Sequence, residues 1–244
     1  MYVMKEGRID SLYSSLKRRL CHNRKHTYID SLDVYEAYRL WAAGYSDETA
    51  TSFLDNELAH VMLDGLPQTR LLDAGCGIGR RIAHTANAVG MDLNAEMLAA
   101  GGCSNTVKGD VRAMPFAANS FDMVWCRLVL GHLSDARTAY RELARVCTPE
   151  GYVFVTDFHA DAVAAGHQRT FTDAAGSVHG IEHYVHSNHV LLAVDAGLSF
   201  IAQQDGIVGP SIRHFYERGI GMKAYRRDFG LKLVAAFLFR KSAP

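Results

Sequence analysis

Three glycines at alternate positions follow a short apolar run near residue 70. The stretch reads LLDAGCGIGR, from Leu71 to Arg80, and contains Gly75, Gly77 and Gly79. A glycine turn directly after a strand lets the backbone approach a ligand closely. Two ligand classes fit such a turn: a dinucleotide, whose pyrophosphate must be held, and S-adenosylmethionine, which carries no phosphate.

The spacing of these glycines argues against a dinucleotide. The dinucleotide fingerprint, Gly-x-Gly-x-x-Gly, uses its third glycine to pack a helix closely on a strand. Arg80 occupies that position here, and a bulky side chain fits the turn poorly. The spacing therefore makes a dinucleotide-dependent oxidoreductase the least favoured alternative.

Carboxylates stand at the ends of three predicted strands. Asp73 ends the first, Asp92 ends the second in VGMDLN, and Asp110 follows the third. Ligands of parallel sheets bind at the carboxyl ends of the strands. Asp92 can accept hydrogen bonds from both ribose hydroxyls, worth about 1.5–3 kcal/mol each when charge-assisted. Asp110 can accept from an adenine amino group.

Short apolar runs that alternate with helical patterns must position these groups. Asn94 and Ser134 can cap two of the helices, and a further helix is predicted over 188–196. The alternation predicts an α/β fold with a doubly wound, mostly parallel sheet. Only 13 residues lead from Gly79 to Asp92, so the first helix must be short or the second strand must begin late. The predicted strands cover residues 70–73, 88–92, 106–109, 121–126, 152–156, 198–204 and 231–240.

Four stretches in order, LDAGCGIG, GDVRAMPF, SFDMV and CRLVLGHLSD, resemble the motifs of class I S-adenosylmethionine-dependent methyltransferases. The resemblance covers most of residues 33–240. It implies a seven-stranded, Rossmann-like methyltransferase fold with an N-terminal helical lid. The arm and lid would occupy 1–67 and the core 68–244, with acceptor-side insertions near 160–189 and 206–230.

The same resemblance implies a set of residues that bind S-adenosylmethionine and its product S-adenosylhomocysteine. Asp73 is expected near the ammonium of the methionine part. Tyr38 and Tyr45 are expected in the lid, where an aromatic ring over the sulfonium would contribute about 0.5–2 kcal/mol by cation–π contact. Leu93 and Val111 are expected at the adenine. The full set is Tyr38, Tyr45, Asp73, Gly75, Gly77, Asp92, Leu93, Asp110, Val111, Arg127 and Leu128.

Histidines supply the candidates on the acceptor side. Aligning the acceptor with the methyl group can contribute about 7–11 kcal/mol. A general base adds roughly 10²–10⁴ in rate, only where the acceptor must lose a proton. His132, in LVLGHLSD, and His159, in TDFHAD, are the candidate bases, each with a structural role as the alternative. Arg169, His183 and His186 are the substrate-side candidates, because their region resembles the acceptor-side cap of related bacterial methyltransferases.

No metal site is predicted. GIEHYVHSNH places Glu182, His183, His186 and His189 close together, but it lacks the helical His-Glu-x-x-His pattern. Ser187 and Asn188 instead indicate a helix start. Five scattered cysteines without a Cys-x-x-Cys pair argue against a disulfide framework or structural zinc.

Charge and hydropathy exclude further classes. The chain has 26 basic and 26 acidic residues, so no overall field favours nucleic acid. The apolar run at 233–239 is far too short to span a bilayer, and no signal-peptide core follows the start. We therefore expect a cytoplasmic protein without a membrane partner.

Two basic segments allow a second interpretation. Residues 1–30 carry a local charge of +4. They are either an arm for nucleic acid or an acidic partner, or, as we favour, an amphipathic helix that packs on the domain or on a homodimer mate. The basic, aromatic stretch 207–230 is either a single-stranded RNA surface or, as we favour, a wall of the acceptor pocket.

The sequence thus predicts an S-adenosylmethionine-dependent methyltransferase that acts on a small-molecule, biosynthetic acceptor by in-line methyl transfer. The alternatives are an RNA or protein methyltransferase and a non-catalytic module that binds the cofactor.

Overall fold

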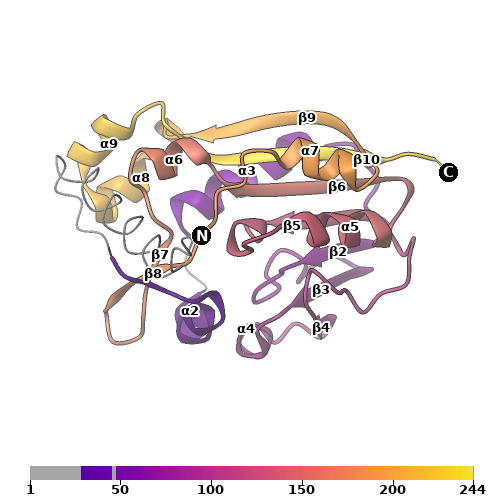
Figure 1. Ribbon diagram of the computed structural model, residues 1–244. Helices are drawn as coiled ribbons and strands as arrows, with labels where there is room; N and C mark the ends of the chain where they lie inside the picture. The colour runs from indigo at the N-terminus through magenta and orange to yellow at the C-terminus, as the bar shows by residue number, and fades with distance from the viewer. Residues whose placement is uncertain (1–28, 46–47, 244) are drawn as a thin grey trace, which may run out of the picture.

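A seven-stranded sheet forms the centre of the computed structural model, which describes residues 29–45 and 48–243 (Figure 1). Its strand order is β4-β3-β2-β5-β6-β10-β9. The first five strands in this order run parallel, and β10 is antiparallel to both its neighbours. This confirms the predicted α/β class and the doubly wound, mostly parallel sheet. The strands are β2 (Leu71–Ala74), β3 (Ala88–Asp92), β4 (Thr106–Lys108), β5 (Phe121–Arg127), β6 (Cys147–Phe158), β9 (Leu198–Ile207) and β10 (Lys232–Lys241).

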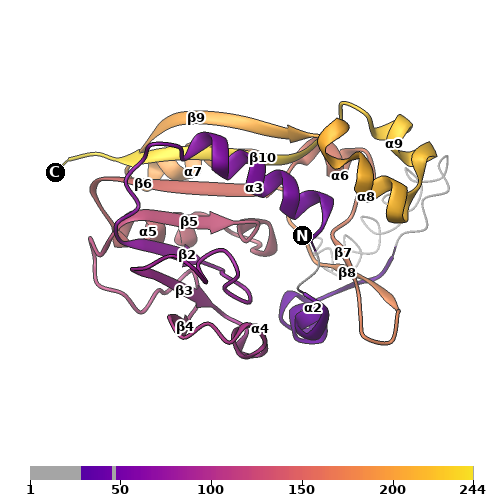
Figure 2. The same cartoon turned by 180° about the vertical axis from the view of Figure 1, so that it is seen from behind.

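Helices cover both faces of the sheet. On one face α3 (Ala50–Met62) lies along β9 and β10 and buries Leu54 and Leu58 (Figure 2). On the other face, α5 (Arg137–Val146) and α7 (His189–Asp195) cover the strands. A core on each side of one sheet leaves the carboxyl ends of the strands free to carry a site.

Two predicted helix caps have different outcomes. Asn94 does cap α4 (Ala95–Gly101), since its side-chain oxygen accepts from the amide of Met97 at 3.0 Å. The prediction for Ser134 is wrong. Asp135 instead accepts from the amide of Arg137 at 2.9 Å, and a carboxylate suits the positive end of α5 better than a hydroxyl does.

The first crossover contains no helix. Between β2 and β3 the chain runs through successive turns, with backbone bonds from Gly79 to Cys76, from Ile82 to Gly79 and from Thr85 to Ile82. The second strand still begins at Ala88, as predicted. The short spacing is therefore met by the loss of the helix, not by a later strand.

A small cap joins two segments that are far apart in the sequence. β1 (Ser31–Leu32) pairs in parallel with β8 (Val178–Ile181), which pairs with β7 (Thr170–Thr172). On this sheet packs helix α2 (Val34–Trp41), part of the predicted lid, followed by the 3-10 turn η1 (Ala42–Gly44). Ala37, Phe171 and Ile181 form the buried contact. Residues 160–189, predicted as an acceptor-side insertion, contain α6 (Ala160–Ala164) and the two strands β7 and β8 of this cap.

The remaining predicted segments lie elsewhere. α3 packs on the sheet and not over its edge, and the predicted boundary at residue 67 stays a prediction. The segment 206–230 forms η3 (Pro210–Ile212), α8 (Arg213–Phe215), η4 (Tyr216–Ile220) and α9 (Met222–Asp228). Residues 1–28, with the arm and its dimer hypothesis, lie outside the described residues. In the part of the chain that the structure describes, no helix is long and apolar enough to cross a membrane.

Candidate active site

A cavity of about 320 Å³ lies at the carboxyl ends of the parallel strands, between the glycine loop and α2. Ligand cavities have volumes of about 300–1,000 Å³. Ten of the eleven predicted cofactor residues line it, all but Asp73, and so does His132. A more open hollow of about 750 Å³ lies along the first crossover and residues 101–105, and none of the predicted site residues lines it.

The glycine loop brings bare backbone to this cavity. Gly75 has φ +86°, and a Cβ there would meet Val129 Cγ2 at 2.2 Å. Gly77 has φ +59°, and a Cβ there would meet the Tyr45 ring at 3.3 Å. The amide of Gly75 donates to Met91 on the neighbouring strand at 2.6 Å. A side chain at either position would strain the loop and crowd Val129 or Tyr45.

Asp92 fastens the loop to the end of β3. Its Oδ2 accepts from the amide of Gly77 at 2.8 Å, and its Oδ1 accepts from the amide of Asn94 at 2.9 Å. Burial raises the pKa of Asp92, and these two bonds oppose the rise. Each oxygen can accept a further hydrogen bond from the cavity, as the ribose prediction requires.

The predicted adenine end has a residue that the sequence did not suggest. Arg112 pairs with Asp110. Its Nη2 donates to Oδ2 of Asp110 at 2.6 Å, and its backbone amide donates to Oδ1 at 2.8 Å. The bond from Arg112 lowers the pKa of Asp110. Val111 is buried, whereas Leu93 is 45% exposed at the cavity rim.

The lid helix is bonded to both sides of the cavity. Asn94 Nδ2 donates to the carbonyl of Tyr35 at 3.2 Å, and the Tyr35 hydroxyl donates to Glu96 Oε2 at 3.4 Å. On the other side, the Tyr38 hydroxyl lies 3.0 Å from His132 Nε2. The structure therefore holds α2 over the strand ends, with Tyr38 and Tyr45 at the cavity.

His132 is held in one tautomer. Its Nδ1 lies 3.0 Å from the carbonyl oxygen of Glu182, which can only accept, so Nδ1 carries the hydrogen. Nε2 then accepts from Tyr38. Burial and the positive charge of Arg169 lower the pKa of His132 to about 3, so the ring is neutral at physiological pH.

Leu128 begins the segment that leads from β5 to His132. Its φ of +60° lies in the left-handed region, which costs a residue other than glycine about 1–3 kcal/mol. Its amide donates to the Thr156 carbonyl at 2.9 Å and lies 3.1 Å from Thr156 Oγ1. Strain of this kind is often found at functional sites.

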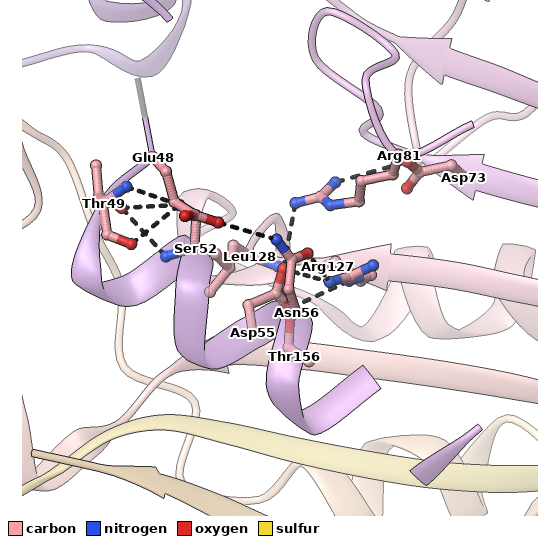
Figure 3. A network of polar contacts seen from close by, with 10 residues as sticks. All are labelled: Glu48, Thr49, Ser52, Asp55, Asn56, Asp73, Arg81, Arg127, Leu128 and Thr156. Carbon is pink, nitrogen blue, oxygen red and sulfur yellow. Dashed lines mark hydrogen bonds and ion pairs between the residues drawn. The ribbon is translucent and has the colours of Figure 1, made fainter. Parts of the chain in front are cut away.

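Behind the glycine loop lies a buried charge network (Figure 3). Arg127, at the end of β5, donates to Asp55 through Nε at 3.1 Å and Nη2 at 2.8 Å. Thr156 donates to Asp55 at 2.6 Å, and Arg81 Nη2 donates to it at 3.4 Å. Burial alone would raise the pKa of Asp55, but the charges of Arg127 and Arg81 hold it below its usual value. No sequence pattern predicted this network, because Asp55 stands in an ordinary helical pattern.

Asp73 is the predicted cofactor residue that the cavity does not reach. Its side chain is fully buried. Arg81 Nη1 lies 3.6 Å from Asp73 Oδ2, and both carboxylate oxygens lack a hydrogen-bond partner among the described residues. Burial raises the pKa of Asp73, against the charge of Arg81.

His159 does not lie at the cavity. It is the N-cap of α6, where Nδ1 accepts from the amide of Asp161 at 3.0 Å, and Nε2 lies 3.7 Å from Asp205. The predicted contact with an acceptor is therefore replaced by a structural role, and we withdraw His159 as a candidate base. The carboxyl end of β6 is simply farther along the edge than the cavity extends.

The other substrate-side candidates stand behind the cavity wall. His183 Nε2 pairs with Asp157 Oδ1 at 3.3 Å, and His186 Nε2 donates to the carbonyls of Leu130 and Leu133. Neither histidine lines the cavity, nor does any residue of 206–230. These positions support the turn that carries His132.

The residues considered as a metal cluster in the sequence, Glu182, His183, His186 and His189, do not surround a common point. Burial would raise the pKa of Asp157, but bonds from His183 and His189 hold it well below its usual range. Tyr140 and His189 Nδ1 are 2.9 Å apart. Within the described ranges, no group of three or more His, Cys, Asp or Glu residues is placed to hold a metal ion.

Comparisons with known proteins match this chain to methyltransferases. Residues 72–155, about a third of the chain, match the methyltransferase domain family. Malonyl-[acyl-carrier protein] O-methyltransferase of Erwinia billingiae is 37% identical over 102 residues, which cover 38% of this chain and 41% of that protein. The enzyme of the same name from Gallionella capsiferriformans is 32% identical over 159 residues, covering 55% and 54%. The matched regions thus span about half the length of these relatives.

Solved structures share the fold. The S-adenosylmethionine-dependent methyltransferase of Mesorhizobium loti superposes with a TM-score of 0.60 at 17% identity, covering 79% of this chain and all of that one. The domain match and the shared fold confirm the resemblance to class I S-adenosylmethionine-dependent methyltransferases.

Proposed function

We propose that this chain transfers a methyl group from S-adenosylmethionine to a small-molecule acceptor. The observation that carries the proposal is the convergence of ten predicted cofactor residues on one cavity beside His132. One fold hosts many chemistries, so the proposal depends on the site and not on the fold.

The residues present fit the cofactor. Gly75 and Gly77 leave backbone where a Cβ would collide with Val129 or contact Tyr45. Asp73, expected near the ammonium of the methionine part, is fully buried outside the lining of the cavity, with Arg81 Nη1 3.6 Å from its Oδ2. Asp92 would hold the ribose, and Asp110 with Val111 the adenine.

When bound, the cofactor supplies a methyl group activated by a sulfonium. The protein's part is to align the acceptor with that methyl group and to exclude water. Tyr38 and Tyr45 would cover the reacting centre. His132 would border the acceptor, because it lines the cavity and contacts Tyr38 of α2. Leu128 would border the methionine part of the cofactor.

The Tyr38–His132 pair offers a path for a proton where the acceptor must lose one. The acceptor's proton would move to the Tyr38 oxygen while Tyr38 gives its own hydroxyl proton to Nε2 of His132. The low pKa of His132 makes it a weak base. The site therefore suits best an acceptor that is already deprotonated or that is acidic. Arg169, a predicted substrate-side residue, does not line the cavity, and its Nη1 is buried without a hydrogen-bond partner among the described residues.

Titration calorimetry of the whole chain with S-adenosylhomocysteine, with NADH alongside, tests the proposal. We expect micromolar affinity for S-adenosylhomocysteine and none for NADH. Binding of NADH alone would overturn it. A screen for methyl transfer then follows, and it includes malonyl thioesters because the names of two relatives specify malonyl-[acyl-carrier protein].

The alternatives give different results in the same assays. An RNA or protein methyltransferase would bind its macromolecule with an affinity that falls with salt. A non-catalytic module would bind S-adenosylhomocysteine but methylate nothing in the screen.

A further inference from the structure

The cap supplies a wall of the cavity that the cofactor does not explain. Five residues of the cap line the cavity and form what we call the cap wall: Asp33, Val34, Tyr35, Glu182 and Tyr184. None of them was predicted from the sequence to bind the cofactor or the acceptor. Because the backbone carbonyl of Glu182 also holds His132, the cap wall lies beside the proposed acceptor.

One parallel strand pairing brings the two halves of the cap wall together. Leu32 of β1 pairs with Ile181 of β8, and the amide of Glu182 donates to the Leu32 carbonyl at 3.0 Å. Asp33 and Glu182 directly follow these paired residues, so their backbones are neighbours at the ends of two parallel strands. Two positions after each carboxylate stands a tyrosine that also lines the cavity. The cap wall therefore combines two carboxylates with two aromatic rings.

The arginines that line the cavity are already neutralised by carboxylates. Arg112 pairs with Asp110 at 2.6 Å, and Arg127 pairs with Asp55 at 2.8 Å. Arg169 acts electrostatically on the site but does not line the cavity. Within the described residues, the lining thus offers no unpaired guanidinium to an anionic group of the acceptor.

The carboxylates of the cap wall, by contrast, can still accept hydrogen bonds. Asp33 is the N-cap of α2, and only its Oδ1 is used there, accepting from the amide of Glu36 at 3.2 Å. Glu182 holds His132 through its backbone, and the described residues supply no hydrogen bond or ion pair to its carboxylate. The charge that the cap wall presents to a ligand is therefore negative.

Two carboxylates beside two aromatic rings fit an organic cation. An ammonium donates charge-assisted hydrogen bonds to carboxylates and is attracted to the face of an aromatic ring. Tyr35 is 42% exposed and Tyr184 is 39% exposed, so both side chains are accessible at the cavity. A metal ion fits less well, because no group of three or more His, Cys, Asp or Glu residues in the described ranges is placed to hold one.

We propose that Asp33 and Glu182 bind an ammonium group of the methyl acceptor, with the two tyrosines as its aromatic neighbours. The proposal rests on the proposed function and names the class of its substrate. This class is a small molecule with an amine at one end and a deprotonated or acidic reacting group at the other. The reacting group would lie at the Tyr38 hydroxyl, where the path for a proton begins. The competing interpretation is that Asp33 only caps α2 and that Glu182 only faces solvent.

The test uses two sets of probes that differ chiefly in the charge of one end. Tyramine, tyrosol and para-hydroxyphenylacetate share a phenol, whereas δ-aminovalerate, δ-hydroxyvalerate and glutarate share a carboxylate. Each probe is titrated by calorimetry into the chain saturated with S-adenosylhomocysteine. In at least one set, the amine should bind about 10-fold more tightly than the alcohol, as expected for partly screened charges and a ring contact. The probe with the additional carboxylate should bind least.

Conservative variants assign this preference to the cap wall. Asp33→Asn keeps a good N-cap residue, and Glu182→Gln keeps the backbone carbonyl that holds His132, so both variants should fold. The double variant should lose most of the preference for the amine and bind the alcohol as the wild type does. Glu57→Gln with Asp64→Asn removes two exposed carboxylates outside the cavity, and this matched control should keep the preference.

Each contrary result has its own meaning. The proposal fails if, in both sets, the amine binds the wild-type chain no more tightly than the alcohol, and this comparison decides even where a variant does not fold. It also fails if the double variant keeps the preference, because the cation is then held elsewhere. If the wild-type chain does not bind S-adenosylhomocysteine at all, the proposed function itself fails.

Discussion

The hydroxyl of Tyr38 lies 3.0 Å from Nε2 of His132, across 94 positions of sequence. The contact joins the lid helix to the turn after β5 and fills the one ring nitrogen that could act as a base. Because Nδ1 faces the Glu182 carbonyl, His132 reaches the cavity as a base only through Tyr38.

Loss of this pair should lower turnover and leave cofactor affinity intact. On an acceptor that must lose a proton, His132→Ala and Tyr38→Phe should each reduce kcat by about 10²–10⁴. Calorimetry with S-adenosylhomocysteine should show little change. Tyr35→Phe, in the same helix but bonded to Glu96, is the matched control. If His132→Ala loses affinity and turnover together, the residue is structural.

The same residue should make stability depend on pH. His132 has a folded pKa of about 3, against about 6.5 when unfolded. Between these values the unfolded chain binds a proton that the folded chain does not. The free energy of unfolding should therefore fall as pH decreases below about 6.5, by up to about 1.4 kcal/mol per pH unit for this proton.

Urea unfolding between pH 7.5 and pH 4.5, the range chosen to cross about 6.5, measures this slope. His132→Gln still offers an amide oxygen to Tyr38 but has no proton to bind, so its curve should be shallower. Parallel curves for the two proteins would show that His132 titrates normally.

Asp92 should be essential for cofactor affinity. Asp92→Ala is expected to weaken S-adenosylhomocysteine binding by about one to two orders of magnitude, on the basis of charge-assisted bonds to ribose. The substitution also frees the amide of Gly77. Asp92→Asn, which keeps one acceptor oxygen, separates the two effects. Unchanged affinity in both variants would contradict the ribose assignment.

Local patterns were enough to predict the sheet and the cofactor edge. Apolar runs bounded by turns predicted all seven strands, and glycines and aspartates at the strand ends pointed to one edge. Both signals depend on neighbours in sequence. The network around Asp55 could not be predicted in this way, because Arg127 is 72 positions away and only the packing of α3 on the sheet joins them.

Residue type also could not distinguish a histidine that lines the cavity from one that only supports the surrounding backbone. His159 and His186 looked like His132 in sequence, yet one caps a helix and the other bonds two carbonyls. A ring nitrogen satisfies backbone groups as readily as it contacts a ligand. The extent of the cavity distinguishes these histidines, because His132 lines it and His159 and His186 do not.

Two glycines with nearly the same φ angle test the approach of the loop to the ligand. Gly75 has φ +86° and Gly176 has φ +84°, but only Gly75 has an obstacle, Val129, where a Cβ would stand. Alanine should cost each site about 1–2 kcal/mol of backbone strain. Only Gly75→Ala should abolish S-adenosylhomocysteine binding. Equal affinities in the two variants would mean that the ligand does not approach the loop.

The buried pair of Arg127 and Asp55 should govern stability. The side chain of Arg127 is 3% exposed and that of Asp55 is 0% exposed, and Arg127 Nη2 lies 2.8 Å from Asp55 Oδ2. Arg127→Met leaves Asp55 with Arg81 and Thr156 alone, and removal of one partner of a buried pair costs about 3–5 kcal/mol.

Urea unfolding checks this cost against an exposed pair of the same length. Arg39 and Glu36 lie 2.7 Å apart in α2 with both side chains more than a third exposed, so Arg39→Met should barely move the midpoint, because water screens the pair. The double variant Asp55→Leu with Arg127→Met should recover part of the loss, since no carboxylate is then left buried. A single variant Arg127→Met as stable as Arg39→Met would mean that Arg81 alone is enough to neutralise Asp55.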